Sequence, residues 1–214
     1  MKIVSINIGA PREVFHDGCL IRTGINKKPV DGRVRVTAMN IEGDRQADLS
    51  VHGGANKAVY AYPAEHYEYW RKEMPNVNLS WGSFGENLTT EGLVENELNI
   101  GDRLCVGAVE LIVTEPRLPC YKLGVKFDRA DMVRRFLKSR RTGFYCAVLR
   151  EGEISAGDTI HYLSRDENRL TVADVTRLYV FDRKDFDGMR LAIRAKSLPG
   201  TWRDYFRKRL EAPY

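Results

Sequence analysis

The spacing of apolar residues changes near Arg165, and this change most constrains the fold. Residues 1–164 carry short runs in which apolar residues alternate or cluster, separated by glycine-containing turns, which is typical of β-strands. From Arg165 onward the apolar residues recur at the three- and four-residue spacing of amphipathic helices. We therefore predict a mainly β domain over residues 1–164 and a small three-helix domain over residues 165–214.

The first part is predicted to form a β-barrel with flanking helices. Many short strands joined by glycine turns are typical of such barrels. A hairpin is expected over 104–114 with its turn near Gly107, and the helices are expected at 63–74 and 131–139. The remaining predicted strands share β-prone composition, and the last two are expected to pair with each other: 33–39, 58–62, 144–149 and 154–163.

Three short helices are predicted in the tail. The first begins with a capping box, because Thr171 is followed three positions later by Asp174. Since the apolar stripes of the helices can satisfy one another, we expect a compact unit that packs lightly on the barrel or on a second subunit of a homodimer. The stripes are Val172, Val175 and Tyr179; Phe186, Met189 and Ile193; and Trp202, Tyr205, Phe206 and Leu210.

The net charge of +5 is concentrated in the tail. Residues 165–214 contain twelve Lys and Arg against eight Asp and Glu, a net of +4, which leaves +1 for residues 1–164. A basic three-helix unit suggests a DNA-binding helix-turn-helix. However, charges of both signs are mixed, and no helix is strongly cationic before Arg207–Arg209. We therefore do not expect nucleic acid as a partner.

Composition excludes a disordered chain and a membrane-spanning one. Hydrophobic residues make up 43% and charged residues 29% of the chain, and no apolar run approaches the roughly 18 residues of a spanning helix. The four cysteines show no C-x-x-C spacing and the four histidines no paired ligand spacing, so neither a disulfide framework nor a zinc site is expected. With no signal-peptide pattern at the start, the cytoplasm is the expected compartment.

Cys120 has a setting suited to chemistry. Pro116 and Pro119 fix the backbone and remove N–H donors, so the thiol is predicted on an ordered loop rather than in a helix or a central strand. Arg117 and Lys122 place positive charge on both sides, which favours the thiolate, the form that attacks electrophiles and binds metals. An inert, buried cysteine is the competing interpretation.

Two glycine-containing segments are further candidates. Gly53 and Gly54, between His52 and Lys57, permit positive φ values and close approach of a ligand, so their N–H groups are candidates for binding an anion. Asn87 follows a glycine in a second loop and offers an amide to a ligand. An ordinary turn is the competing interpretation in both places.

Together and in this order, the segments resemble the MOSC domain family, in its YiiM-type branch. The resemblance covers residues 30–164, and the tail is similar to the three-helix domain that follows MOSC in this branch. The matching motifs are Glu42-Gly-Asp44, Val51-His-Gly-Gly54 with Lys57, Tyr62-Pro63 followed by Glu65-His-Tyr67 and Tyr69-Trp70, Phe84-Gly-Glu-Asn-Leu88, Ile100-Gly-Asp102, and Pro116-Arg-x-Pro-Cys-x-Lys-Leu123.

The resemblance implies binding of the molybdenum cofactor, in which a pterin dithiolene holds molybdenum. Cys120 is then the protein's ligand to the metal, a role that suits a thiolate. Asn87 is expected to hydrogen-bond to the pterin or to an oxo ligand. The phosphate of the pterin requires cations or N–H donors, for which the candidates are Lys57, Arg117, His52, Gly53, Gly54 and Arg45.

Relatives of this kind reduce N-hydroxylated bases and amidoximes, and the resemblance implies the same small-molecule substrates here. His52 is the candidate proton donor, with a structural role in a turn as the competing interpretation. No flavin or nicotinamide fingerprint occurs, so electrons are expected from a partner reductase, which the basic tail would attract if it is acidic. Sulfur transfer through a persulfide on Cys120 and non-catalytic carriage of the cofactor stay open.

Overall fold

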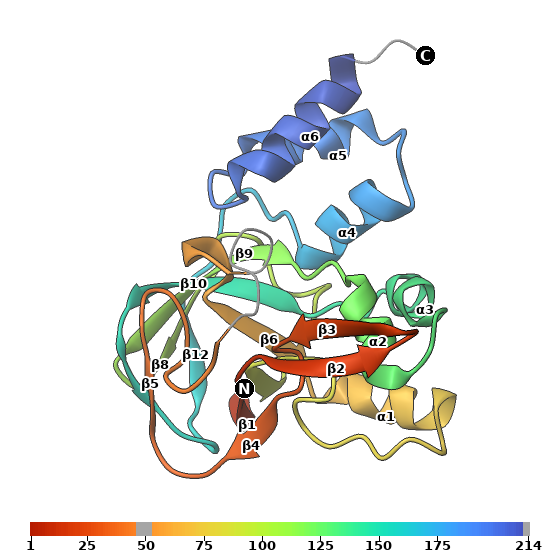
Figure 1. Cartoon of the computed structure of the whole chain (residues 1–214). Helices are drawn as coiled ribbons and strands as arrows, with labels where there is room; N and C mark the ends of the chain where they lie inside the picture. Colours follow the sequence, from red (N-terminus) through yellow and green to blue (C-terminus); the bar gives the residue numbers. More distant parts are fainter. Residues whose placement is uncertain (46–52, 212–214) are drawn as a thin grey trace.

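A large mixed sheet organises the protein (Figure 1). The computed structural model describes residues 1–45 and 53–211. Neighbouring strands of the sheet are antiparallel except for β6 and β7, which are parallel. In spatial order its eight strands are β12 (Ile160–Ser164), β8 (Arg103–Val106), β9 (Val109–Pro116), β10 (Phe144–Arg150), β6 (Val59–Pro63), β7 (Leu88–Glu91), β1 (Lys2–Ile8) and β4 (Lys28–Val30).

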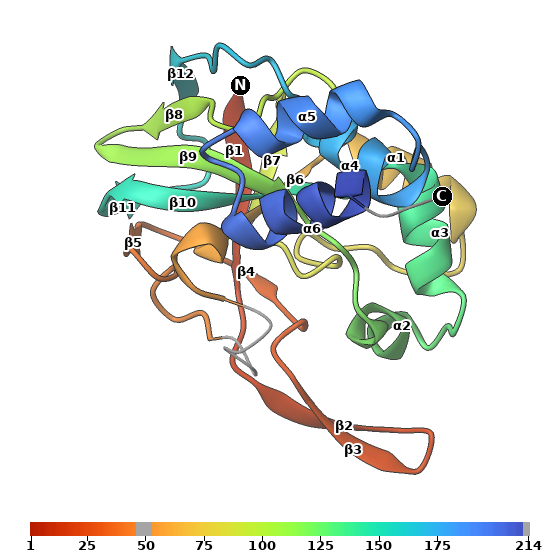
Figure 2. The same cartoon turned by 90° about the horizontal axis from the view of Figure 1, so that it is seen from above.

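Two small sheets flank the large one. The strands β5 (Val34–Val36) and β11 (Gly152–Ile154) pair with each other. The strands β2 (Arg12–His16) and β3 (Cys19–Thr23) form a hairpin, which projects from the rest of the molecule in Figure 2. The hairpin was not predicted, because residues 12–23 show no clear apolar period.

The predicted hairpin at 104–114 is confirmed, because β8 and β9 pair around the turn at Gly107. The predicted pairing of 144–149 with 154–163 is wrong. Strand β10 lies between β9 and β6, β11 pairs with β5, and β12 pairs with β8. A turn redirects the chain between β11 and β12: Gly157 has a φ of 91°, and the Ser155 N–H donates to Asp158 Oδ2 over 2.8 Å.

The sheet does not close into the predicted barrel within the described residues. Strand β1 meets the segment before β12 through one isolated bridge, between Lys2 and Thr159. Three backbone hydrogen bonds join the same two segments: the Ile3 N–H donates to the Asp158 carbonyl over 2.9 Å, the Gly157 N–H to the Ile3 carbonyl over 2.8 Å, and the Ile160 N–H to the Met1 carbonyl over 2.9 Å. One edge of β1 pairs with β7 over residues 2–6, and the other edge pairs with β4 over residues 6–8. Only the first residues of β1 therefore have an unpaired edge that the segment before β12 can reach, and the pairing between these two segments ends after those residues.

Three helices and an aromatic cluster cover one end of the sheet. The predicted helices are confirmed as α1 (Glu65–Glu73) and α3 (Met132–Ser139), whereas α2 (Tyr121–Phe127) was not predicted. In the described part of the chain, no helix is long and apolar enough to cross a membrane. The side chains buried between these helices and β6, which we call the aromatic cluster, are Tyr60, Tyr62, Tyr67, Trp70, Met74, Leu79, Phe84, Leu123, Met132 and Phe136.

The three predicted tail helices are confirmed as α4 (Val172–Val180), α5 (Phe186–Arg194) and α6 (Gly200–Glu211), which lie together beside the sheet in Figures 1 and 2. The predicted capping box is also present. The Asp174 N–H donates to Thr171 Oγ1 over 3.0 Å, and the Thr171 N–H donates to Asp174 Oδ2 over 3.1 Å. This reciprocal pair satisfies two donors at the start of α4.

The helices pack against the sheet more closely than expected. Buried side chains of the tail, including Val175, Leu178 and Phe206, belong to the same apolar core as Val113 of β9. The Val172 N–H also donates to the Leu98 carbonyl over 2.9 Å. The change from strands to helices falls between β12 and α4, but a single core spans it.

Removing residues 165–214 should strongly destabilise the remaining chain. Each large apolar side chain left in water costs about 1.5–3 kcal/mol, so uncovering a few of them removes much of a typical unfolding free energy of about 5–15 kcal/mol. Urea unfolding of a chain ending at Ser164 measures this. Lys208→Ala, exposed on α6, is the control and should change stability by no more than about 0.5 kcal/mol. Full stability in the shortened chain would refute the shared core.

Candidate functional site

A pocket opens between the sheet and the segment that follows the β2–β3 hairpin. It holds about 640 Å³ of empty space, part of it open to solvent. Six of the seven predicted site residues that the structure describes line it: Cys120, Lys57, Arg117, Gly53, Asn87 and Arg45. Gly54 lies beside it, and the predicted His52 lies outside the described residues. We call this hollow the cationic pocket, because lysine and arginine side chains line it.

The charge of the pocket is strongly one-sided. Five lining side chains are cationic, and none of the described lining residues is acidic: the cations are Lys27, Arg45, Lys57, Arg117 and Lys122. Such a concentration of positive charge in a concave site attracts anions and strengthens their binding. The pocket is therefore suited to an anionic ligand that also meets a thiol.

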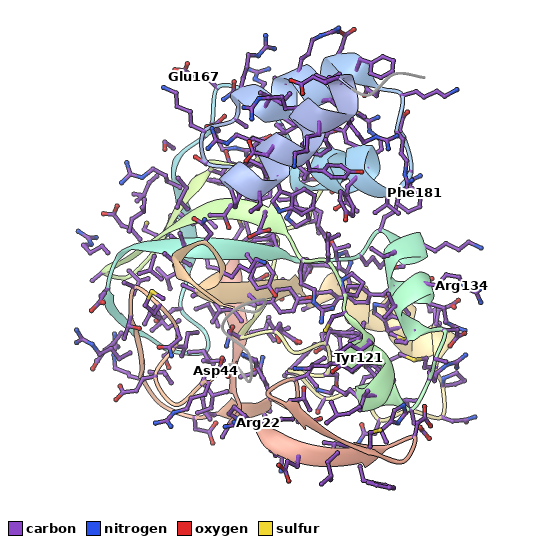
Figure 3. The ribbon with its side chains drawn as sticks, turned by 45° about the horizontal axis from the view of Figure 1, so that its top comes forward. Arg22, Asp44, Tyr121, Arg134, Glu167 and Phe181 are labelled. Atoms are coloured by element: carbon purple, nitrogen blue, oxygen red, sulfur yellow. The ribbon has the colours of Figure 1, made fainter. Side chains whose placement is uncertain are left out.

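Cys120 occupies the N-cap position of α2, outside helix and strand as predicted. Its backbone is extended, with φ −109° and ψ 172°, and its carbonyl accepts from the Leu123 N–H over 3.0 Å. Leu123 is fully buried in the aromatic cluster, which anchors the helix. The next residue, Tyr121, is exposed (Figure 3). The half-buried Cys120 thus stands at the N-terminus of α2, on a loop that the buried Leu123 holds in place.

Arg117 is buried, yet it has an unused donor. Its Nη1 has no hydrogen-bond partner among the described residues. The guanidinium lies over two rings of the aromatic cluster, 5.3 Å from the centre of Tyr60 and 5.1 Å from that of Phe136. Arg117 also interacts electrostatically with Cys120. Because a buried donor without a partner is costly, this nitrogen points to an anionic group as its missing partner.

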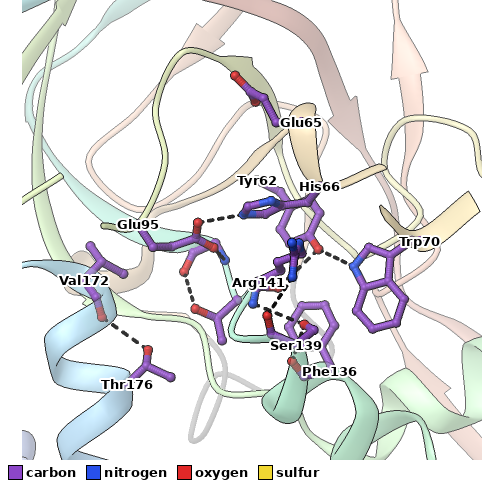
Figure 4. A network of polar contacts seen from close by, with 12 residues as sticks. Tyr62, Glu65, His66, Trp70, Glu95, Phe136, Ser139, Arg141, Val172 and Thr176 are labelled. Atoms are coloured by element: carbon purple, nitrogen blue, oxygen red, sulfur yellow. Dashed lines mark hydrogen bonds and ion pairs between the residues drawn. The ribbon is translucent and has the colours of Figure 1, made fainter. Parts of the chain in front are cut away.

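A hydrogen-bond network fixes the backbone of Arg117, and Figure 4 shows the part of it that joins Glu95 to His66. The Arg117 N–H donates to the Gly143 carbonyl over 3.3 Å. In turn, the Gly143 N–H donates to Glu95 Oε1 over 2.6 Å, and Glu95 Oε2 lies 2.7 Å from His66 Nε2. The buried Glu95 therefore holds the segment that positions Arg117.

A second buried carboxylate joins two of the predicted motifs. Asp44 pairs with Lys27 and accepts from Asn87 Nδ2 over 2.9 Å and from the Gly9 N–H over 2.9 Å. Asn87 Oδ1 accepts from the Tyr60 N–H over 3.1 Å. Both ends of the Asn87 amide are thus engaged within the protein, and its contact with a pterin stays a prediction. Burial lowers the pKa of Lys27, although the Asp44 carboxylate opposes this.

Lys27, Tyr60 and Tyr145 line the pocket but were not predicted as site residues. Lys27 belongs to a segment without a periodic pattern, and only its pairing with Asp44 in the structure identifies it as a residue of the site. The two tyrosines lie in the predicted strands and face the pocket from neighbouring strands, β6 and β10. Sequence alone gave no signal that separates them from core residues.

Gly53 and Lys57 bring the predicted glycine segment to the pocket. Gly53 and Gly54 have φ values of 127° and 84°, the left-handed region that favours glycine. The Lys57 N–H donates to the Gly54 carbonyl over 2.9 Å. Lys57 Nζ lies 3.9 Å from Glu115 Oε1 and 5.9 Å from the centre of the Tyr145 ring, so the ammonium is held at the edge of the pocket.

Comparison with known proteins identifies the family. Residues 48–161 match the model of the MOSC domain, and residues 170–212 match that of the YiiM-like, 3-alpha helix domain. Over 208 residues the chain is 40% identical to "Uncharacterized protein YflK" of Bacillus subtilis, covering 97% of this chain and 94% of that protein. It is also 37% identical over 161 residues to a protein of Gibberella moniliformis named "Reductase", covering 74% of this chain and 28% of that protein.

The fold agrees with a solved structure. The crystal structure of YiiM from Geobacillus stearothermophilus matches with a TM-score of 0.83 and 32% sequence identity over 98% of both chains. The match therefore extends over both the sheet and the three C-terminal helices. The chain belongs to the MOSC domain family, in the branch that carries the YiiM-like three-helix domain.

Proposed function

We propose that this protein is a molybdenum cofactor-dependent reductase of N-hydroxylated compounds that takes electrons from a partner reductase. The observation that carries the proposal is that Cys120, a half-buried cysteine, and Arg117 line the same cationic pocket, and that Arg117 Nη1 has no hydrogen-bond partner among the described residues. The relative named "Reductase" supports reductive chemistry in a chain that contains this domain.

The pocket residues fit the molybdenum cofactor. Cys120 would ligate the metal, since thiolates are good ligands for such centres. Arg117, Lys57 and Arg45 would hold the phosphate of the pterin, because cations bind phosphate through charge-assisted hydrogen bonds.

The reaction consumes two electrons and two protons: R–NH–OH becomes R–NH₂ and water as the N–O bond breaks. When bound, the cofactor supplies the two-electron chemistry. The protein supplies ligation, orientation and protons. Electrons come from the partner reductase, which the net charge of +4 on residues 165–214 would attract if that partner is acidic.

Replacing Cys120 with serine should abolish molybdenum retention and turnover with little loss of stability. The thiol lies at a half-buried loop position, so a near-isosteric hydroxyl removes ligand chemistry and little packing. Metal analysis and an amidoxime reduction assay with a reconstituted reductase check this on protein made in a host that synthesises the cofactor.

Cys146→Ser is the matched control. Cys146 is fully buried in β10, where burial raises the pKa of its thiol. A buried hydroxyl there should cost about 1 kcal/mol or more, while metal content stays unchanged. Molybdenum retained by Cys120→Ser would refute the ligand role. Labile sulfur on Cys120 in metal-free protein would instead indicate sulfur transfer.

Neutralising Arg117 or Lys57 should weaken cofactor retention. Each charge-assisted hydrogen bond contributes about 1.5–3 kcal/mol, so Arg117→Gln or Lys57→Gln should reduce affinity by roughly 10- to 100-fold. The cofactor that remains should be lost more readily at high salt. Pterin content after dialysis at low and high salt measures both effects.

Arg22→Gln provides the control for that measurement. Arg22 is exposed on the β2–β3 hairpin (Figure 3), so removing its charge should leave pterin content unchanged. Equal pterin content in the control and in both pocket variants would place the phosphate elsewhere.

A further inference from the structure

A second hollow lies where the helical domain meets the sheet, with about 970 Å³ of empty space that is partly open to solvent. We call it the interdomain groove. Cys120, Lys57 and Tyr145 line both this groove and the cationic pocket. Cys120 therefore borders two hollows, one suited to an anionic cofactor and one that this cofactor does not require. Residues that characterise the groove are Glu115, Leu118, Tyr179, Trp202 and Tyr205.

Aromatic rings form the helical wall of the groove. The ring of Tyr179 on α4 lies 4.8 Å from that of Tyr205 and 5.1 Å from that of Trp202, both on α6. Among the described lining residues, only Lys57 and Glu115 are charged. An aromatic wall with few charges favours a neutral planar ring, which packs against such side chains by stacking or edge contacts.

Glu115 lies at the end of β9, beside this wall. It is buried, accepts a hydrogen bond from Trp202 Nε1, and has Lys57 Nζ 3.9 Å from its Oε1. Burial raises the pKa of Glu115, and the Trp202 and Lys57 contacts oppose this in part. The carboxyl thus retains its proton at a higher pH than an exposed glutamate, and two partners stabilise the carboxylate after the proton leaves.

We propose, on the basis of the proposed function, that the interdomain groove binds a planar aromatic N-hydroxylated substrate and that Glu115 delivers a proton to its N–OH group. The N–O bond breaks, the oxygen leaves as water, and the nitrogen keeps its bond to carbon. Two electrons come from the partner reductase. One of the two protons comes from Glu115, which becomes a carboxylate and is reprotonated from solvent, and the other comes from solvent.

The groove is tested first by binding. Isothermal titration of oxidised holoenzyme with benzamidoxime, in the absence of a reductant, measures affinity without turnover. Tyr205→Leu should weaken benzamidoxime binding by about tenfold, since a stacking contact contributes roughly a factor of ten. It should leave the affinity for the aliphatic acetamidoxime unchanged. Phe181→Leu is the control, because Phe181 is exposed at the end of α4 (Figure 3) and does not line the groove.

The proton donor is tested by the pH dependence of turnover. Because Glu115 must be protonated, kcat/KM should fall as pH rises through its pKa. Glu115→Gln should lower kcat by roughly 100-fold and remove this alkaline limb, with benzamidoxime affinity and molybdenum content unchanged. Glu115→Asp should recover part of the rate and restore the limb. A pH profile that is unchanged in Glu115→Gln would overturn the role of Glu115.

The experiments distinguish an error in the proposed role of the groove from an error in the proposed function. Holoenzyme that reduces neither amidoxime would refute the function, while the titration still tests the groove. Unchanged benzamidoxime affinity in Tyr205→Leu would overturn the groove as the substrate site. Slower turnover of Tyr205→Leu only with the partner reductase, and not with a chemical reductant, would identify the groove as the donor's docking surface and overturn the proposal.

Discussion

The burial of the Arg117 guanidinium over the rings of Tyr60 and Phe136 is the interaction on which the cationic pocket depends. Cation–π contacts contribute about 2 kcal/mol when they are desolvated, whereas an uncompensated buried charge costs several. The aromatic cluster therefore holds the cation without neutralising it. Its Nη1, which has no hydrogen-bond partner in the part of the chain that the structure describes, remains available to an anion.

Buried carboxylates connect the pocket to the sheet. Asp44 holds Lys27 and Asn87, and Glu95 holds Gly143 and, through it, Arg117. A third, Glu86, accepts from the Gly82 N–H over 2.8 Å and from the Phe84 N–H over 3.0 Å, and burial raises its pKa. Each acid ties segments of loop to strands, which limits the freedom of the groups that line the pocket. A site fixed in this way is preorganised for its ligand.

The two hollows give Cys120 two distinct surroundings. On the pocket side the neighbours are cations, and on the groove side they are aromatic rings and Glu115. The second surrounding exists only because α4 and α6 share a core with β9. The helical tail thus shapes the space around the thiol, a more direct contribution than the light packing that its apolar stripes suggested. Charge steering by the tail stays a prediction beside this structural role.

Local signals determined much of this protein. The capping box at Thr171, the turn at Gly107 and the constraint of Pro119 before Cys120 are short-range, so the sequence alone predicted the tail helices, one hairpin and the loop position of the thiol. Long-range pairing was decided only by the tertiary structure, because an apolar strand edge fits many partners. No local spacing predicts a contact between residues far apart in the chain. Such contacts bury Arg117 over two rings, pair Lys27 with Asp44 and join Glu115 to Trp202. The limited pairing that leaves the sheet open is also between distant segments.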